Sequence, residues 1–163
     1  MVTMHSVHEK GFTLSELLIV IALLGLLFVG SYSYINPKAQ LAKGRDSRRK
    51  KDFAVMKRVL EDYHNDHEQY PPLALMDCSQ PDLLKPYISR LPCDPNGVSY
   101  VYKLCDADGR QYSLYGRLEN SQDLSLREQQ CGGGCIVDGA AYNYAVTSGG
   151  SLCGQSSILP TPT

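Results

Sequence analysis

The sequence predicts an α+β fold, in which a long N-terminal helix packs on a small antiparallel sheet of three to four strands and disulfides staple the structure. Three observations predict this fold. Residues 12–35 are almost continuously apolar, residues 53–67 carry apolar side chains every three or four positions, and residues 98–146 contain short alternating segments separated by turns. The six cysteines of this 163-residue chain indicate disulfides and an oxidising compartment.

The apolar stretch is long enough to cross a membrane. As a helix, residues 12–35 would span roughly 36 Å, which exceeds the hydrocarbon thickness of a bilayer. The stretch contains one charged residue, Glu16. A charge in mid-bilayer costs roughly 2.5–3.5 kcal/mol on insertion scales, so the presence of Glu16 in this stretch indicates that its carboxylate has a functional role. Gly25, Gly30 and Pro37 are positions where the helix can bend.

A secretory signal peptide is the alternative interpretation of this stretch. Such a peptide has a shorter apolar core followed by small residues at a cleavage site, and residues 31–33 (Ser-Tyr-Ser) come nearest to that pattern. The distinctive residues Gly11 and Glu16 instead precede the apolar core, which favours a different kind of leader.

Residues 10–17, Lys-Gly-Phe-Thr-Leu-Ser-Glu-Leu, resemble the class III leader junction of type IV pilins and of type II secretion pseudopilins. In that family a dedicated peptidase cuts after the Gly, the new N-terminal Phe is methylated, and the fifth mature residue is Glu. Gly11, Phe12 and Glu16 occupy those positions. Where many members have a proline inside the mature helix, Ser33 stands here and Pro37 follows.

A more moderate resemblance to the same family continues downstream. It covers the run from Asp52 to Tyr70-Pro71 and residues 91–102, Leu-Pro-Cys-Asp-Pro to Tyr-Val-Tyr. Together with composition, it divides the chain into a leader (1–11), a transmembrane and assembly helix (12–36), an exported head that includes the amphipathic half of the helix (37–153), and a flexible Ser-, Pro- and Thr-rich tail (154–163).

Within the head, the helix is expected to continue to about residue 67. Its apolar stripe, which we expect to cover the sheet, consists of Phe53, Met56, Leu60, Tyr63 and His67. Alternation predicts strands at 98–104, 112–118 and 141–146, with a hairpin turn at 106–109 and a polar loop at 119–134. A short helix is expected at 82–87.

The resemblance implies a structural role for the apolar helix. In a filament the membrane segments leave the lipid and pack together, so a buried carboxylate needs a partner. The N-terminal amine of Phe12 on a neighbouring subunit would supply that partner for Glu16. The apolar packing would come from five side chains: Leu14, Leu17, Leu18, Ile21 and Leu24.

The predicted function is therefore that of a structural subunit, and we expect no enzyme, because no catalytic motif is present. The implied partners are other copies or other pilins, a prepilin peptidase and methylase, an assembly platform protein with its ATPase, and the membrane. The alternative is a membrane-anchored exported binding domain that does not polymerise, which would tolerate Glu16→Ala. The sequence leaves open which machine the subunit serves: secretion, adhesion and motility, or DNA uptake.

A run of basic residues complicates the topology. Six Lys and Arg side chains follow the apolar stretch: Lys43, Arg45, Arg48, Arg49, Lys50 and Lys51. The positive-inside rule alone would keep this side in the cytoplasm. The cysteines and the leader junction favour export, so we expect a single-pass inner-membrane protein with an exported head, and then an extracellular or periplasmic filament. The basic run can face solvent, anionic lipid or acidic patches on neighbouring subunits. Because the whole chain has a net charge of −1, no nucleic acid partner is expected.

The cysteines are Cys78, Cys93, Cys105, Cys131, Cys135 and Cys153. Six cysteines allow fifteen pairings, and the sequence cannot choose among them. Cys78 with Cys93 would close the loop before the sheet, and Cys131 with Cys135 would close a Gly-rich turn. A zinc site at residues 131–135 is the alternative, but no second short-spaced Cys or His pair lies nearby.

No cofactor is expected, although calcium remains a possibility. Some pseudopilins bind calcium before their last strand, and the resemblance therefore directs attention to Glu119, Asp123 and Asp138. Asp106-x-Asp108-Gly109 resembles the start of a calcium loop, but a hairpin turn already explains it. Glu61, His64 and His67 have a spacing that can bind a metal, yet we expect them to be solvated or to lie at the edge of the core.

Overall fold

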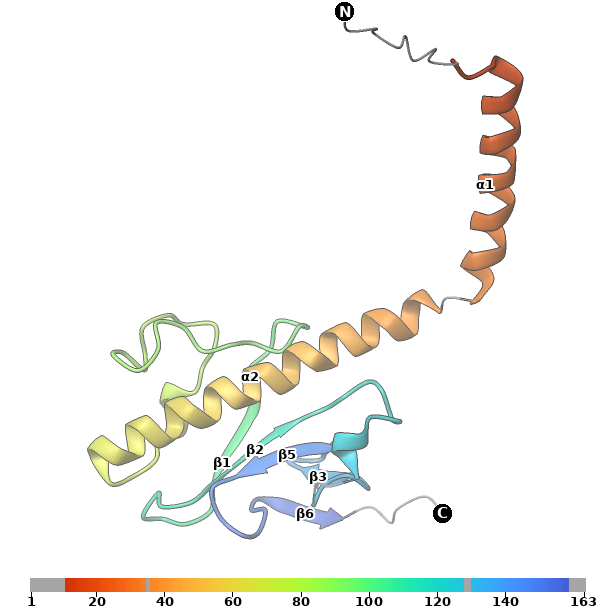
Figure 1. The fold of residues 1–163 in the computed structure, drawn as a ribbon. Helices are drawn as coiled ribbons and strands as arrows, with labels where there is room; N and C mark the ends of the chain where they lie inside the picture. Colours follow the sequence, from red (N-terminus) through yellow and green to blue (C-terminus); the bar gives the residue numbers. More distant parts are fainter. Residues whose placement is uncertain (1–10, 35, 128–129, 159–163) are drawn as a thin grey trace, which may run out of the picture. The chain divides into compact units, whose positions relative to one another are not determined.

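The computed structural model describes residues 11–34, 36–127 and 130–158. The chain divides into two units, Met1–Lys38 and Ala39–Thr163. Helix α1 (Leu14–Tyr34) belongs to the first unit. The second unit contains almost all of helix α2 (Pro37–His67) and all the strands that the structure describes (Figure 1).

The expected single helix over residues 12–67 is interrupted. Helix α1 continues through Gly25 and Gly30 and ends at Tyr34, whereas α2 begins at Pro37. Proline has no N–H and disfavours the helical conformation of the preceding residue, but it suits the first position of a new helix. The interruption therefore coincides with Pro37, and Ser33, which stands where many family members have proline, lies inside α1.

The first sheet contains the first two predicted strands and the second half of the third. Its order is β1 (Val101–Leu104), β2 (Tyr112–Gly116) and β5 (Tyr144–Thr147), and both pairs are antiparallel. The predicted hairpin turn at 106–109 is confirmed. The N–H of Gly109 donates to the carbonyl of Asp106 over 3.3 Å, and the φ of Gly109 is 64°, a conformation that glycine adopts without strain.

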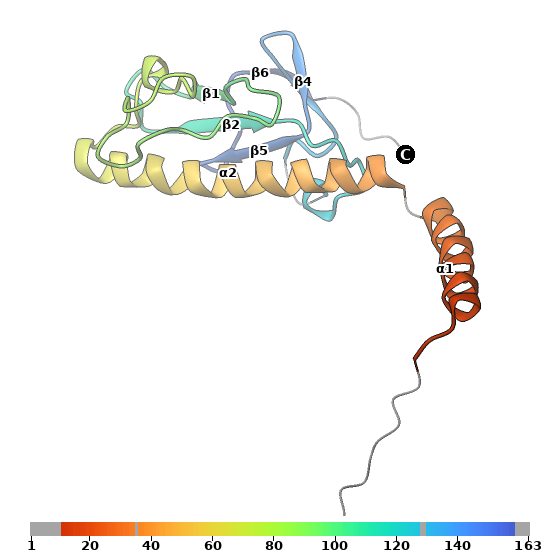
Figure 2. The same ribbon diagram turned by 90° about the horizontal axis from the view of Figure 1, so that it is seen from above.

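Helix α2 covers this sheet through its apolar stripe (Figure 2). The ring of Phe53 meets the rings of Tyr100 and Tyr144 edge to face, with centroids 4.9 and 5.1 Å apart. Gly116 makes room for Phe53, because a Cβ at that position would lie 2.8 Å from the ring. The predicted stripe is confirmed in its buried part, Phe53, Met56 and Leu60; Val59 joins it, Tyr63 is half-buried and His67 is exposed.

A second sheet was not expected from the sequence. Its order is β4 (Ala140–Tyr142), β3 (Cys135–Val137) and β6 (Gln155–Ile158), again antiparallel. The predicted strand at 141–146 is split at Asn143 between the two sheets. The Asn143 side-chain amide there accepts from the N–H of Leu118 at 2.8 Å and donates to its carbonyl at 3.0 Å.

The expectation of a flexible tail over 154–163 is wrong for residues 155–158, which form β6. The segment Gln-Ser-Ser-Ile has no alternating pattern, so its strand depends on backbone pairing with β3. The neighbouring Cys153 is bonded to Cys105, which holds the start of β6 in place. Residues 159–163 lie outside the described residues.

The prediction of a short helix at 82–87 is also wrong. These residues form successive turns, because Pro86 cannot donate a helical hydrogen bond and Asp82 has a φ of 71°. In the described residues the connections contain two single-turn 3₁₀ helices, η1 (Leu73–Leu75) and η2 (Leu124–Leu126).

Three disulfides hold the loops and strands together. Cys78 is bonded to Cys93 and Cys131 to Cys135, the two pairs suggested by the sequence. The remaining pair, Cys105–Cys153, links the end of the β1–β2 hairpin to the segment before β6. No cysteine is left free.

Candidate processing and assembly site

Helix α1 begins at Leu14, so Phe12 and Thr13 separate it from the Gly11–Phe12 peptide bond. Thr13 caps the helix, because its Oγ1 accepts a hydrogen bond from the N–H of Glu16 at 3.2 Å. Its carbonyl accepts the first helical hydrogen bond, from the N–H of Leu17, also at 3.2 Å. Gly11 and Phe12 therefore precede the helix, and both are exposed. A Thr cap followed by Glu three residues later is a recognised start signal for a helix.

Glu16 lies in the first turn of α1 and is the only charged residue of that helix. Its carboxylate is near the positive end of the helix dipole, which favours a negative charge there. Phe12 precedes Glu16 by about one helical turn. The local structure thus places the Glu16 carboxylate about one helical turn beyond the peptide bond at which the predicted leader ends.

The rest of α1 is apolar on every side. Residues Leu14–Ser31 have a mean hydropathy of 2.4, and none of this window is buried. The large apolar side chains from Phe12 to Val29 are all exposed, from 48% at Val20 to 83% at Phe12. Leu14 and Leu17 belong to this surface. A helix that is apolar all round needs a lipid or protein environment, and α1 is long enough to span a membrane.

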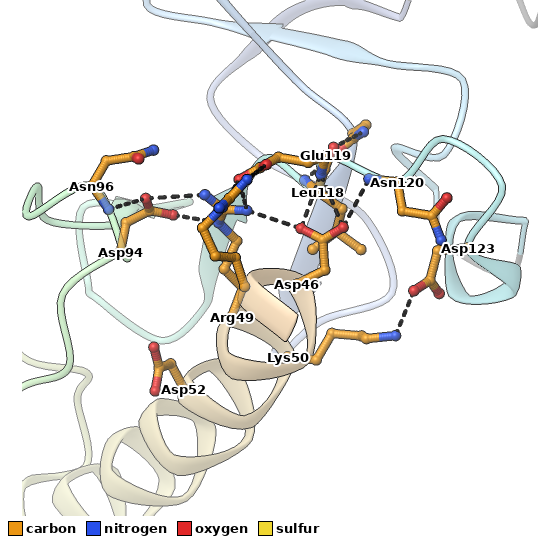
Figure 3. A network of polar contacts seen from close by, with 12 residues as sticks. Asp46, Arg49, Lys50, Asp52, Asp94, Asn96, Leu118, Glu119, Asn120 and Asp123 are labelled. Carbon is orange, nitrogen blue, oxygen red and sulfur yellow. Dashed lines mark hydrogen bonds and ion pairs between the residues drawn. The ribbon is translucent and has the colours of Figure 1, made fainter. Parts of the chain in front are cut away.

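A polar site in the second unit holds α2 against two loops (Figure 3). Arg49 lies at its centre and is 2% exposed. Its Nε and Nη2 donate to the carboxylate of Asp94 at 2.6 and 3.3 Å. Its Nη1 donates to Asp46 at 2.9 Å and to Glu119 at 2.8 Å. We call Asp46, Arg49, Asp94 and Glu119 the buried ion cluster, after its buried centre Asp46 and Arg49; Asp94 is half-buried and Glu119 reaches the surface.

Asp46 completes the cluster by binding backbone groups. Its carboxylate, 1% exposed, accepts from the N–H of Glu119 at 2.9 and 3.1 Å and from the N–H of Asn120 at 2.8 Å. A buried carboxylate requires such partners, and here they come from the loop that follows β2. The loop after β2 is therefore fixed to the helix.

The electrostatics of the cluster follow from these contacts. Hydrogen bonds from Arg45 and then Arg49 lower the pKa of Glu119 to about 2. Burial alone would raise the pKa of Asp94, but hydrogen bonds from Arg49 and the N–H of Asn96 outweigh it, and the pKa lies below its ordinary value. The bond to Asp94 raises the pKa of the Arg49 guanidinium, although burial opposes this change.

The three calcium candidates lie apart, each beside a basic side chain. Glu119 forms ion pairs with Arg45 and Arg49, and Asp138 forms one with the Nζ of Lys103 at 2.6 Å. Asp123 forms an ion pair with the Nζ of Lys50 at 2.7 Å, and its side chain caps η2 by accepting a hydrogen bond from the N–H of Ser125. Hydrogen bonds from Lys50 and then Ser125 lower the pKa of Asp123 to about 2.

The other metal candidates make ring and hydroxyl contacts. Glu61 accepts from the hydroxyl of Tyr70 at 3.0 Å, and the ring of His64 lies 4.5 Å from that of Tyr70. The ring of His67 stacks on Tyr63 at 4.1 Å. In the described part of the chain, no group of three or more His, Cys, Asp or Glu side chains is placed to hold a metal ion.

The sequence interpretation missed the buried ion cluster. The run at 43–51 was expected to face its surroundings as one surface, but Arg45, Arg49 and Lys50 turn towards acidic side chains of the head. A signal was present, because Asp46 and Arg49 continue the three- and four-residue spacing of Phe53 and Met56. Polar residues in register with an apolar stripe indicate a buried ion pair.

The comparisons with known proteins identify the N-terminal segment. The family described as the prokaryotic N-terminal methylation motif matches residues 7–32. The matched range contains Gly11, Phe12, Glu16 and nearly all of α1. The chain therefore carries the class III signal of type IV pilins and pseudopilins. Neither the curated proteins nor the solved structures gave a match.

Proposed function

We propose that this chain is a prepilin-type structural subunit. It is cleaved after Gly11, methylated on Phe12 and assembled through α1 into a type IV pilus or a type II secretion pseudopilus. One observation carries the proposal: the methylation motif at residues 7–32 coincides with a capped helix start at Leu14 and with a helix that is apolar on every side. The motif itself indicates a processed, exported protein of the prepilin type.

The geometry around Gly11 supports cleavage. Proteolysis requires an exposed, extended segment, and Gly11 and Phe12 are exposed and precede the helix. Thr13 keeps the helix from extending towards the bond, since its side chain caps the first turn. A prepilin peptidase would therefore meet a substrate that needs no local unfolding.

Cleavage would create a partner for the Glu16 carboxylate, which forms no ion pair with a residue that the structure describes. The new amine on Phe12 is positively charged, and methylation leaves that charge in place. In a filament, α1 would pack against the α1 helices of neighbouring copies, and Glu16 of one copy would bind the Phe12 amine of the next. The pair would fix the axial register, because any other offset would bury a charge without its partner.

The remaining partners follow from this mechanism. The segment Leu14–Ser31 would hold the subunit in the inner membrane with the head exported, where its three disulfides can form. A platform protein and an ATPase would extract subunits from the membrane into the filament. We propose assembly, without catalysis, as the whole activity of the chain.

The testing experiment is the intact mass and N-terminal sequence of the protein purified from its native membrane. A chain that begins with methylated Phe12 is the expected result. A chain that begins at Met1 would contradict the proposal and favour a non-polymerising anchored domain. A chain that begins beyond Ser33 would identify an ordinary secretory signal peptide.

A pair of glycine variants makes the same test specific. Gly11→Leu should block cleavage, so that the purified chain keeps its first eleven residues. Gly30→Leu is the matched control, because a Cβ at Gly30, as at Gly11, meets no atom within 4 Å. It should be processed normally. Equal processing of both variants would show that Gly11 does not direct the cleavage.

A further inference from the structure

The exposed charges of α2 are sorted along its length. Every exposed Lys and Arg of the helix lies at or before Arg58, and every exposed Asp lies at or after Asp62. The carboxylates in the earlier part, Asp46 and Asp52, are buried or half-buried. The outward surface of α2 is therefore basic over most of its length and acidic at its C-terminal end.

The basic part of this surface lacks partners within the chain. We define the basic face as Lys43, Arg48 and Lys51, which are exposed and form no ion pair with any residue that the structure describes. By contrast, their neighbours Arg45, Arg49 and Lys50 all have carboxylate partners. The internal acids of the head are thus already engaged, and the basic face must find its counter-charge elsewhere.

Small residues make the same surface accessible. Gly44 and Ser47 lie between the cations of the basic face, Ala54 follows Lys51, and all three are exposed. Their spacing places them with Lys51 on the side of the helix opposite the buried stripe. A Cβ at Gly44 would meet no atom within 4 Å, so no contact within the chain requires glycine there, although glycine weakens a helix interior. A closely approaching partner would explain the small side chains.

Carboxylates gather at the other end of the same unit. The N–H of Tyr70 donates to the carbonyl of Gly109 at 2.7 Å, which places the β1–β2 turn beside the end of α2 (Figure 1). The exposed acids of both segments, which we call the acidic end, are Asp62, Asp66, Glu68, Asp106 and Asp108. Arg110 is the one exposed Lys or Arg in residues 104–110, so the acidic end is predominantly negative.

We infer that the basic face of one copy binds the acidic end of a second copy. The two surfaces are complementary in charge and lie on different parts of one chain. Such a contact is heterologous and leaves one basic face and one acidic end free after each addition, so it propagates into an open helical filament wherever the rotation between copies does not close a ring. The inference rests on the proposed function and adds to it a head-to-head contact that is separate from the pairing of Glu16.

Charge reversal tests the inference in the full-length chain in its native host. Lys43→Glu/Lys51→Glu leaves the basic face with a net negative charge, and Asp62→Lys/Glu68→Lys/Asp108→Lys leaves the acidic end with a net positive charge. No described residue forms an ion pair with any of these five, so the head should still fold. We expect each variant to lower the yield of sheared filaments by about tenfold, because like charges then face each other.

The chain that carries all five substitutions is the decisive variant. Each contact again joins opposite charges, so filament yield should recover towards the wild-type level. Arg90→Glu/Arg117→Glu is the control for the charge lost from the basic face, since both residues are exposed and lie outside the two surfaces. It should assemble normally. A five-substitution chain that assembles no better than the two separate variants would overturn the inference.

Two further outcomes separate the possible failures. If the wild-type chain yields no filament, the proposed function fails, and this inference fails with it. If wild-type filaments form, phosphatidylglycerol vesicles test lipid as the alternative partner. Loss of vesicle binding by Lys43→Glu/Lys51→Glu, without filament recovery in the five-substitution chain, would assign the basic face to anionic lipid and overturn the contact between copies.

Discussion

Arg49 and Asp94 form a bidentate ion pair although 45 residues separate them in the sequence. The Arg49 side chain is 2% exposed and that of Asp94 12%, so both charges are largely removed from water. Such a pair contributes little net stability, because desolvation opposes the attraction. It contributes specificity, since α2 can slide on the sheet only by leaving these charges buried without partners.

Replacing Arg49 should therefore destabilise the head strongly. Arg49→Met retains much of the volume but leaves Asp46 and Asp94 without their guanidinium partner. We expect a loss of about 3–5 kcal/mol in the free energy of unfolding, as for other broken buried pairs. Urea unfolding of the detergent-solubilised chain, followed by tyrosine fluorescence, measures it. Arg48→Met, on the exposed neighbour, should change the value by less than about 0.5 kcal/mol; equal losses would refute a special role for Arg49.

Acid should weaken the same part of the structure. Glu119 and Asp123 have pKa values of about 2, below their ordinary values of 4.5 and 3.8. A carboxyl group with a lowered pKa in the folded state stabilises it above the ordinary pKa, and this contribution disappears as the pH falls towards the folded-state value. The urea concentration at the unfolding midpoint should thus decrease as the pH is lowered from about 5 to about 2.

Glu119→Gln tests this pH dependence. The variant should be less stable than wild type at neutral pH, but its urea midpoint should change less between about pH 5 and pH 2, because one of the linked groups is gone. Asp108→Asn is the control, since Asp108 is exposed and forms no ion pair with a described residue. A Glu119→Gln profile that runs parallel to wild type would show that Glu119 is not responsible.

The sequence predicted those parts of the fold that depend on local patterns. The apolar stretch, the stripe at Phe53, Met56 and Leu60, and the β1–β2 hairpin are each visible as periodicity or turn composition. The second sheet was not predictable in this way. Its strand β6 has no alternation, and it pairs with β3 through backbone groups that no side-chain pattern records.

The N-terminal site was predictable because short-range order encodes it. Gly11, Phe12 and Glu16 belong to one continuous motif, so no tertiary information was needed. The buried ion cluster joins α2 to loops 45 to 73 positions away, and each partner looks like an ordinary surface residue in the sequence. Only the register of Asp46 and Arg49 with the apolar stripe gave a local signal.

The three disulfides should differ in their contribution to stability. Cys105 and Cys153 are 48 residues apart, whereas Cys131 and Cys135 are four apart. In the chain-entropy model, these bonds contribute about 4 and about 2 kcal/mol by restricting the unfolded chain. Cys105→Ser/Cys153→Ser should therefore lower the free energy of unfolding more than Cys131→Ser/Cys135→Ser. The opposite order would show that local structure at the Gly-rich turn outweighs the length of the closed loop.

Glu16→Gln separates insertion from assembly. The substitution removes the only charge of α1 but keeps its size, so the helix should insert into the membrane at least as well as wild type. Processing should also persist, because the Gly11–Phe12 bond lies before the helix. Filament yield should nevertheless fall by at least about tenfold, since the Phe12 amine would be buried without a carboxylate. Ser15→Ala is the matched control, because among the described residues the Ser15 hydroxyl has a hydrogen bond to the neighbouring Thr13 Oγ1, at 3.2 Å. This variant should assemble normally. A Glu16→Gln chain that is processed and still forms filaments at the wild-type level would remove Glu16 from the assembly mechanism.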